Sequence, residues 1–162
     1  MSGHDYSRRQ GIVERLSADE RALRLAAFRS ILARTPASLA ILVERTALAP
    51  EAAASALARL VNAGLIARNE AGDVVGSWGL TPAATSHRLQ MRGEEYHTWC
   101  AEDAVGIPAA LGADATVTST CFHCSREVVV EIARGEVTRA LPPDTCLWLA
   151  EAEIGRSMVG CT

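Results

Sequence analysis

The chain has 162 residues, of which 49% are apolar, and a formal net charge of −3 at neutral pH. This length suits one ordinary domain or two small ones, and the slight negative charge gives no general attraction to nucleic acid. No apolar run approaches the roughly 20 residues needed to cross a bilayer, and no apolar signal segment follows residues 1–10. We therefore expect a cytoplasmic protein with no membrane partner.

The first half of the chain predicts three helices followed by a β-hairpin. Ser17 and Glu20 form a capping-box pattern at the first helix, and Gly64 stands where the third helix needs a left-handed C-cap. Proline suits the first turn of the other two helices. The predicted helices and the two hairpin strands cover residues 17–32, 35–45, 50–64, 65–69 and 74–80. This order is typical of a winged-helix module, which we assign to residues 1–83.

The third helix of a winged-helix module reads DNA only if it presents basic and hydrogen-bonding side chains. Residues 50–62 contain one arginine and one glutamate, and alanine is their commonest residue. The hairpin tip adds Glu70 and Asp73, whose charge repels phosphate. We therefore expect a structural or dimerising module, and we do not expect nucleic acid as a partner.

The second half of the chain is acidic and predicts a small mixed β-sheet domain. Residues 84–162 hold six arginines against eleven Asp and Glu. A helix is expected at residues 94–105, and strands are expected at residues 115–120, 126–133, 145–150 and, more weakly, 156–161. The predicted fold class is therefore α+β, with the winged-helix-like module followed by a second domain over residues 84–162.

All five cysteines lie in the second half, at Cys100, Cys121, Cys124, Cys146 and Cys161. A reducing cytosol argues against a disulfide framework, which leaves free thiols, metal ligands or nucleophiles as alternatives. On a helix, Cys100 and Asp103 would share a face, so that a thiol and a carboxyl lie within reach of each other. An arbitrary Cys-x-x-Asp is nevertheless more often a buried thiol beside a solvated carboxylate.

Cys121 and Cys124 form a C-x-x-C between two predicted strands, which is the arrangement of a metal knuckle. A zinc site usually has two such pairs, and here the residues that would complete a ligand set are Cys146, His97 and His123. A thioredoxin-like pair needs its first cysteine at a helix N-terminus, which the flanking strands do not provide. Cys146 alternates within a predicted strand, so we expect it in the core.

The string Tyr96-x-x-Trp99-Cys100-Ala101-x-Asp103, followed by Ile-Pro-Ala-Ala-Leu at residues 107–111, resembles the signature of the organomercurial (alkylmercury) lyase family. In that family a Trp-Cys-Ala-x-Asp helix precedes a Pro-Ala-Leu segment and a further cysteine, here Cys121. The resemblance covers residues 85–140 and is weaker upstream. At Cys121 it implies a buried structural thiol, whereas Cys124 departs from the family pattern.

The resemblance implies cleavage of a carbon-mercury bond to a hydrocarbon and Hg(II). It implies Cys100 as the thiol that captures mercury, Cys161 as the second thiol, and Asp103 as the group that relays a proton to carbon. Thiolates are soft ligands that suit a soft metal, and a carboxyl can deliver the proton. No organic cofactor is implied. An external thiol, or an acceptor of the mercuric-reductase type, would remove Hg(II).

The family pattern continues beyond Thr162, so the resemblance implies a catalytic domain at residues 84–162 that is short at its C-terminal end. Two other functions remain open. One is a non-catalytic protein that binds or senses a soft metal, mercury or copper, through Cys100, Cys161 and the Cys121/Cys124 pair. The other is a winged-helix transcription regulator with a thiol sensor domain.

Overall fold

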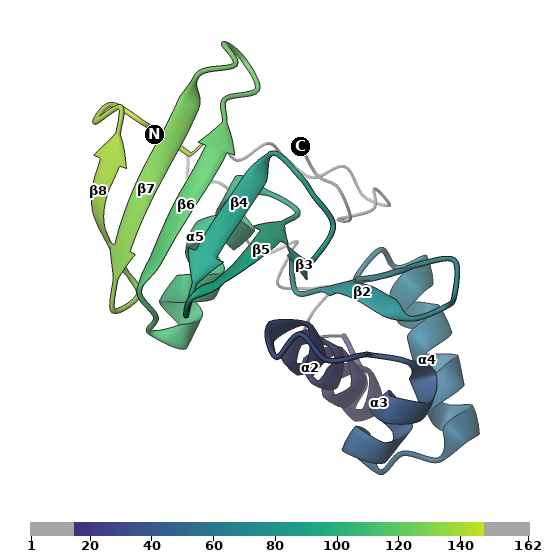
Figure 1. The fold of residues 1–162 in the computed structure, drawn as a ribbon. Coiled ribbons are helices and arrows are strands. Elements are labelled where there is room, and N and C mark those ends of the chain that lie inside the picture. The colour runs from purple at the N-terminus through teal and green to yellow at the C-terminus, as the bar shows by residue number, and fades with distance from the viewer. Residues whose placement is uncertain (1–14, 148–162) are drawn as a thin grey trace.

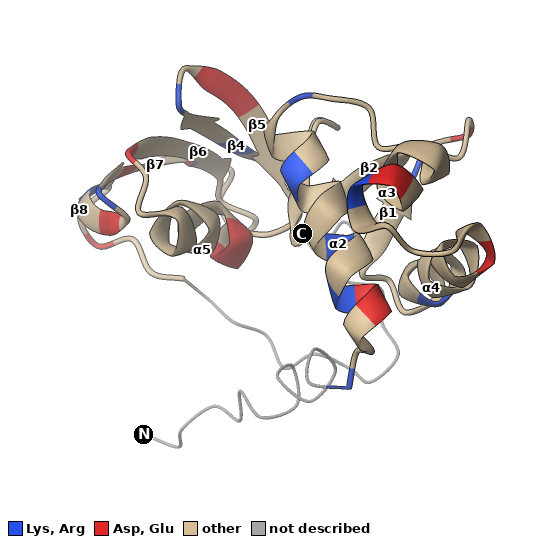
Figure 2. Cartoon of the chain, turned by 90° about the horizontal axis from the view of Figure 1, so that it is seen from below, with Lys and Arg blue, Asp and Glu red and all other residues tan. Residues whose placement is uncertain are grey.

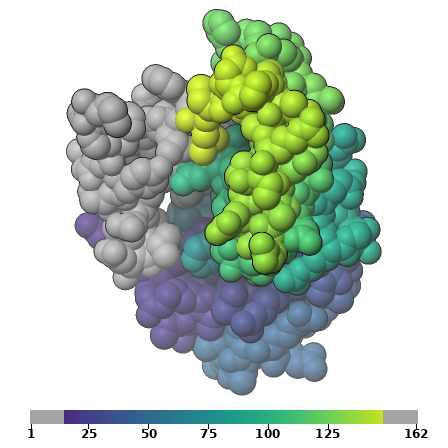
Figure 3. All heavy atoms as spheres, turned by 90° about the vertical axis from the view of Figure 1, so that its left-hand side faces the viewer, coloured from purple at the N-terminus to yellow at the C-terminus, as the bar shows by residue number. Residues whose placement is uncertain are grey.

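The computed structural model describes residues 15–147, and within them three helices precede a sheet that carries one further helix (Figure 1). The elements are α2 (Ala18–Leu32), α3 (Leu39–Thr46), α4 (Pro50–Asn62), β1 (Ile66–Arg68), β2 (Val74–Ser77), β3 (Leu80–Thr81), β4 (His87–Met91), β5 (Glu94–Thr98), α5 (Ala101–Leu111), β6 (Ala115–Thr120), β7 (Glu127–Ala133) and β8 (Glu136–Leu141). Helices α2 to α4 gather at one end of the molecule, and β4 to β8 form the other (Figures 1 and 3).

The three predicted N-terminal helices are present. The capping box at α2 is complete, because the Glu20 N–H donates to Ser17 Oγ at 3.2 Å and the Ser17 N–H donates to Glu20 Oε2 at 2.7 Å. Gly64 has φ of 66° after α4, as expected of a C-cap glycine. The predicted start of the second helix at residues 35–36 is wrong. Ser38 is the N-cap of α3, because its Oγ accepts the Ile41 N–H at 3.4 Å.

A single sheet connects the two halves of the chain. Its strand order is β1-β2-β3-β5-β4-β6-β7-β8, and every described pairing is antiparallel, so the prediction of a mixed sheet is wrong. Tight turns rather than crossovers join most neighbouring strands, and tight turns produce antiparallel pairs. The sheet crosses the boundary expected at residue 83, where β3 pairs with β5. The division into two domains stays a prediction.

The helix predicted at residues 94–105 begins later than expected. Residues 94–98 form β5, which pairs with β4 through a two-residue turn at Arg92 and Gly93, both with positive φ. Tyr96 and Thr98 point into the core from this strand. Residues 94–98 are too few to show a spacing of apolar residues that distinguishes a helix from a strand. Pairing with β4 therefore decides their conformation. The helix α5 starts only after Cys100.

The strands near residues 115–133 are confirmed as β6 and β7, but the rest of the second half differs from the prediction. Strand β8 was not predicted, and it follows β7 through the Arg134–Gly135 turn, whose two residues also have positive φ. Residues 145–147 are not a strand, and Cys146 is exposed rather than in the core. The strand predicted at residues 156–161 lies outside the described residues.

Helix α2 joins the helical end of the molecule to the sheet. Leu23 and Ala27 are fully buried on it, and it contacts α3, α4, β2 and β3. The Tyr96 hydroxyl on β5 donates to the Leu32 carbonyl at 2.7 Å, and Ser77 Oγ on β2 donates to the Arg24 carbonyl at 2.9 Å. Both bonds link the sheet to the backbone of α2, so the helix is held in place against it.

Charges of both signs are spread over the helices and strands (Figure 2). On α4, Arg59 Nε donates to Glu20 Oε1 at 2.7 Å and Arg59 Nη1 donates to Ser55 Oγ at 2.8 Å. The arginine on the helix that would read DNA is therefore engaged within the chain. Among the described helices, none combines the length and apolar character required to cross a bilayer.

We expect the change Tyr96→Phe to lower the free energy of unfolding by about 1 kcal/mol, because a buried hydrogen bond to α2 is lost while the ring is kept. Urea denaturation measures it. The matched control is Thr46→Val, which removes a hydroxyl that bonds only within α3 at 2.7 Å and should change stability little. Equal effects in the two variants would contradict the linking role of Tyr96.

Candidate functional site

The start of α5 is built around Cys100, which is the N-cap of the helix. Its backbone is extended, with φ of −147° and ψ of 171°, and its Sγ accepts the Asp103 N–H at 3.4 Å. A sulfur therefore takes the place that a serine, threonine or aspartate oxygen usually fills. The Thr98 hydroxyl donates to the Cys100 carbonyl at 3.0 Å and ties the cap to the end of β5.

The Cys100 thiol and the Asp103 carboxyl are in direct contact. Cys100 Sγ donates to Asp103 Oδ2 at 3.1 Å. Burial and the negative charge of Asp103 raise the pKa of Cys100 to about 12, against the opposing effect of N–H groups at the helix start. At neutral pH the sulfur therefore keeps its proton, and the proton lies on the line to the carboxylate.

The turn between β2 and β3 lies against Asp103. Gly79 has φ of +77°, and a Cβ added there would lie 2.0 Å from Asp103 Cγ. The Trp99 N–H donates to the Gly79 carbonyl at 2.8 Å, so the turn is also bonded to the segment that leads into α5. Only a residue without a side chain allows the carboxyl to come this close. Sequence analysis missed this role of Gly79, because the contact joins segments that are distant along the chain.

A buried cation on α2 faces the same region. Arg24 is 3% exposed, and its guanidinium carbon lies 3.9 Å from the centroid of a Trp78 ring. Within the described part of the chain, its Nε and Nη1 atoms have no hydrogen-bond partner. Burial lowers the pKa of Arg24 to about 10, and the charge of Asp103 opposes that shift. Nothing in the local sequence around Arg24 signals that it approaches the thiol site.

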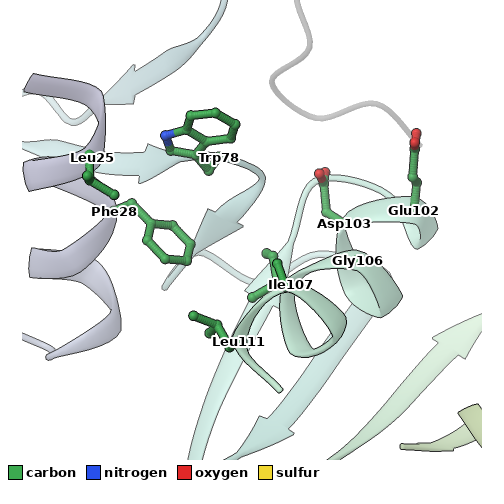
Figure 4. A pocket seen from close by; sticks show the side chains of 9 residues that line it. Leu25, Phe28, Trp78, Glu102, Asp103, Gly106, Ile107 and Leu111 are labelled. Carbon is green, nitrogen blue, oxygen red and sulfur yellow. The ribbon is translucent and has the colours of Figure 1, made fainter. Parts of the chain in front are cut away.

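A cavity of about 360 Å³ lies between α2 and α5 beside Asp103 (Figure 4). Figure 4 shows Phe28 of α2 on one side and Ile107 and Leu111 of α5 on the other. Its full lining is Leu25, Phe28, Trp78, Glu102, Asp103, Gly106, Ile107, Ala110 and Leu111. Apart from the two carboxylates at the first turn of α5, this lining offers mainly apolar surface. The cavity is therefore suited to a small apolar group held next to a carboxyl.

The other candidate residues lie elsewhere or outside the described part of the chain. Cys121 and Cys124 are in the loop between β6 and β7, where Cys121 is partly exposed rather than buried and Cys124 is exposed. Cys161 falls outside the described residues. Within residues 15–147 no three His, Cys, Asp or Glu side chains gather around a possible metal position. The zinc ligand set considered with Cys146, His97 and His123 is therefore not assembled there.

Comparisons with known proteins agree with the sequence signature. The family model described as alkylmercury lyase matches residues 80–162. The alkylmercury lyase of Pseudomonas putida is 35% identical over 81 residues, which are 50% of this chain and 38% of that protein. The alkylmercury lyase of Streptomyces lividans is 38% identical over 74 residues, which are 46% of this chain and 34% of that protein. The matched part thus spans little more than a third of these relatives' length.

The fold is also similar to a solved structure. A crystal structure of the mercury-bound form of MerB2 aligns with a TM-score of 0.75 and 22% sequence identity. The alignment covers 82% of this chain and 65% of that chain. At this identity the similarity establishes the fold alone, and the chemistry has to be argued from the residues of the site.

We expect Gly79→Ala to lower the free energy of unfolding by more than Gly93→Ala does. Both positions have positive φ, near +77° and +80°, so an alanine at either one introduces backbone strain of about 1 to 3 kcal/mol. A Cβ at Gly93 meets nothing within 4 Å, whereas one at Gly79 collides with the Asp103 carboxyl. Urea denaturation of the two variants isolates the collision. Equal losses would show that Asp103 does not depend on this turn.

We expect the Cys100 thiol to react slowly with iodoacetamide at neutral pH and faster as the pH rises toward about 12. Asp103→Asn should speed the reaction at a given pH, because the negative charge that favours the protonated thiol is removed. Glu102→Gln is the matched control and should have a smaller effect. Peptide mass spectrometry assigns the alkylated residue. An unchanged rate in Asp103→Asn would contradict the coupling of the two groups.

Proposed function

Because the chain belongs to the alkylmercury lyase family, we propose that it cleaves the carbon-mercury bond of organomercurials by thiol-assisted protonolysis, releasing a hydrocarbon and Hg(II). The observation that carries the proposal is the hydrogen bond from Cys100 Sγ to Asp103 Oδ2, 3.1 Å long, beside an apolar cavity. This hydrogen bond places a thiol that can bind a soft metal, Cys100, in direct contact with a carboxyl that can carry a proton, Asp103. Mercury is the substrate of this reaction and not a resident cofactor.

In the first step, the mercury of R-Hg(+) bonds to Cys100 Sγ and the thiol proton moves to Asp103 Oδ2. The high pKa of Cys100, about 12, keeps the proton on sulfur until the metal arrives. A coordinating metal ion lowers the pKa of a thiol enough to remove its proton. The proton needs to travel only along the existing hydrogen bond from Cys100 Sγ to Asp103 Oδ2.

In the second step, another thiolate adds to mercury and Asp103 protonates the carbon. We propose Cys161 as this second thiol, on the basis of the family resemblance. Two thiolates raise the electron density on the carbon bonded to mercury. The carbon-mercury bond then breaks as its electron pair takes the proton from Asp103. The hydrocarbon leaves with the proton that began on Cys100, and Hg(II) stays bound to two sulfurs.

The cavity gives the organic group a place during these steps. Phe28, Ile107 and Leu111 line it with apolar surface, and Asp103 lies at its edge. An alkyl or phenyl group in this position would hold its mercury-bearing carbon near the proton donor while limiting access of water. We propose that small thiols, or an acceptor of the mercuric-reductase type, then remove Hg(II). The proposed steps require no organic cofactor.

A second candidate function is soft-metal binding or sensing without turnover. The observation that favours it is the Cys121/Cys124 pair, two partly or fully exposed thiols in one loop without a carboxylate proton donor in the set. Such a protein would bind mercury or copper with the same fold and release no hydrocarbon. Product release therefore distinguishes the two functions.

The deciding experiment is incubation of the full chain with phenylmercury and excess small thiol, with benzene followed by gas chromatography. We expect catalytic release by the wild type and none above background by Cys100→Ser. We expect Asp103→Ala to retain most mercury binding but to lose release by about 100-fold or more, as is usual when a general acid is removed.

The matched control is Cys146→Ser, which removes an exposed thiol that the proposed steps do not use and should release benzene at the wild-type rate. Full release by Asp103→Ala would rule out its proton-carrier role. Stoichiometric mercury binding by the wild type without benzene would replace the lyase with the soft-metal binder.

A further inference from the structure

The loop between β6 and β7 carries two thiols that the proposed reaction does not use. The loop is closed by backbone hydrogen bonds: the Cys121 N–H donates to the Arg126 carbonyl at 2.8 Å, and the Ser125 N–H donates to the Cys121 carbonyl at 2.8 Å. Ser125 has φ of 57°, which turns the chain back toward β7. The loop thus has a defined conformation that places Cys124 beside Cys121.

The geometry of this turn brings the two cysteines together. The Ser125 N–H bonds to the Cys121 carbonyl, so residues 121–125 form a single closed turn, and Cys121 and Cys124 stand three positions apart within it. Donor groups of Cys124 and His123 also lower the pKa of Cys121. The turn therefore presents two sulfurs to one ion.

The pair is open to solvent. Cys124 and His123 are exposed, Cys121 is partly exposed, and the neighbouring Phe122 is 92% exposed. No described residue covers the loop, so an ion carried by a small thiol can reach both sulfurs. The environment is opposite to that of Cys100, where burial raises the pKa.

The number of ligands limits which ion suits the pair. Within the described residues no third His, Cys, Asp or Glu joins these two thiols in a possible metal site. Zinc in structural sites takes four ligands. Two thiolates instead satisfy a soft ion that is stable with two sulfur ligands in a line, such as Hg(II) or Cu(I).

The Cys121/Cys124 pair and Cys100 lie on the same side of the sheet, at the ends of two strands. Strands β5 and β6 both pair antiparallel with β4, so they run in the same direction and their C-terminal ends lie on the same side (Figure 1). Cys100 follows the end of β5 at Thr98, and Cys121 follows the end of β6 at Thr120. Two strand spacings correspond to about 10 Å between these ends.

The link between the ends of β5 and β6 passes through residues 85–86. The Thr120 N–H donates to the Ser86 carbonyl at 3.2 Å, and the Thr85 hydroxyl donates to the Thr98 carbonyl at 2.8 Å. The segment before β4 therefore hydrogen-bonds to both strand ends, which places the Cys121/Cys124 loop and Cys100 on the same side of the sheet.

We propose that Cys121 and Cys124 form a second mercury site, a dithiol that takes one Hg(II) ion from a small-thiol complex. Each cysteine gives its proton to a departing small thiolate as its sulfur bonds to mercury, so two thiols leave as two sulfur-mercury bonds form and nothing is oxidised or reduced. The binding stands on the loop alone. That the ion is the product of Cys100 chemistry rests on the proposed function.

The test uses the reduced full chain with Cys100→Ser, Cys146→Ser and Cys161→Ser combined, which leaves only the pair. Mercuric chloride is added with excess small monothiol, the protein is desalted, and mercury per chain is measured. We expect one Hg(II) per monomeric chain with two sulfur neighbours by X-ray absorption. Adding Cys124→Ser should weaken retention by about 100-fold, because two linked thiols outcompete free ones through effective concentration.

A second measurement avoids the combined variant, in case it does not fold. In the otherwise natural chain, Cys124→Ser should lower the retained Hg(II) by one equivalent, and Cys146→Ser should not. Unchanged retention in Cys124→Ser, or mercury that bridges two chains into a dimer on size exclusion, would overturn the site.

A parallel experiment with zinc tests how many ligands the Cys121/Cys124 site provides. Zinc chloride under the same excess of monothiol should leave no retained metal, and retained zinc would overturn the two-ligand assignment. Mercuric chloride replaces the organomercurial throughout, so failure of benzene release leaves this result unaffected, and the two proposals can fail separately.

Discussion

The hydrogen bonds at the start of α5 are the interaction on which the candidate site depends. Cys100 serves both as the N-cap of the helix and as the donor to Asp103. The N-cap position leaves the sulfur at the end of a strand and the beginning of a helix, where two rigid elements determine its place. The same contact sets the protonation of the thiol, because Asp103 adds its charge to the effect of burial.

The N-terminal helices contribute to the site although the family signature lies entirely in the second half. Arg24 and Phe28 of α2 supply a buried cation and one wall of the cavity. The hydrogen bond from Tyr96 to Leu32 and the continuous sheet hold that wall at a fixed distance from α5. The helical module therefore has a structural role in the site that does not require it to bind DNA.

Cys100 and Cys121 lie in two different chemical environments at the same side of the sheet, where β5 and β6 end. Cys100 is half-buried beside a carboxylate and remains protonated, which suits a group whose proton is used in the reaction. Cys121 is partly exposed among N–H groups that favour its thiolate, which suits reversible binding of a soft ion. The contrast follows from burial and neighbouring charge and not from the residue type, which is the same at both positions.

The sequence alone determined the three N-terminal helices and the strands near residues 115–133, since capping residues and alternation are local properties. It also predicted that Cys100 and Asp103 lie together, but through a shared helix face, whereas in the structure Cys100 is the N-cap of α5. Only the tertiary structure decided that residues 94–98 are a strand, because that depends on pairing with β4. It also brought Arg24 and Gly79 to Asp103, since such contacts depend on how a helix and a turn pack across the sheet and leave no pattern in the neighbouring residues.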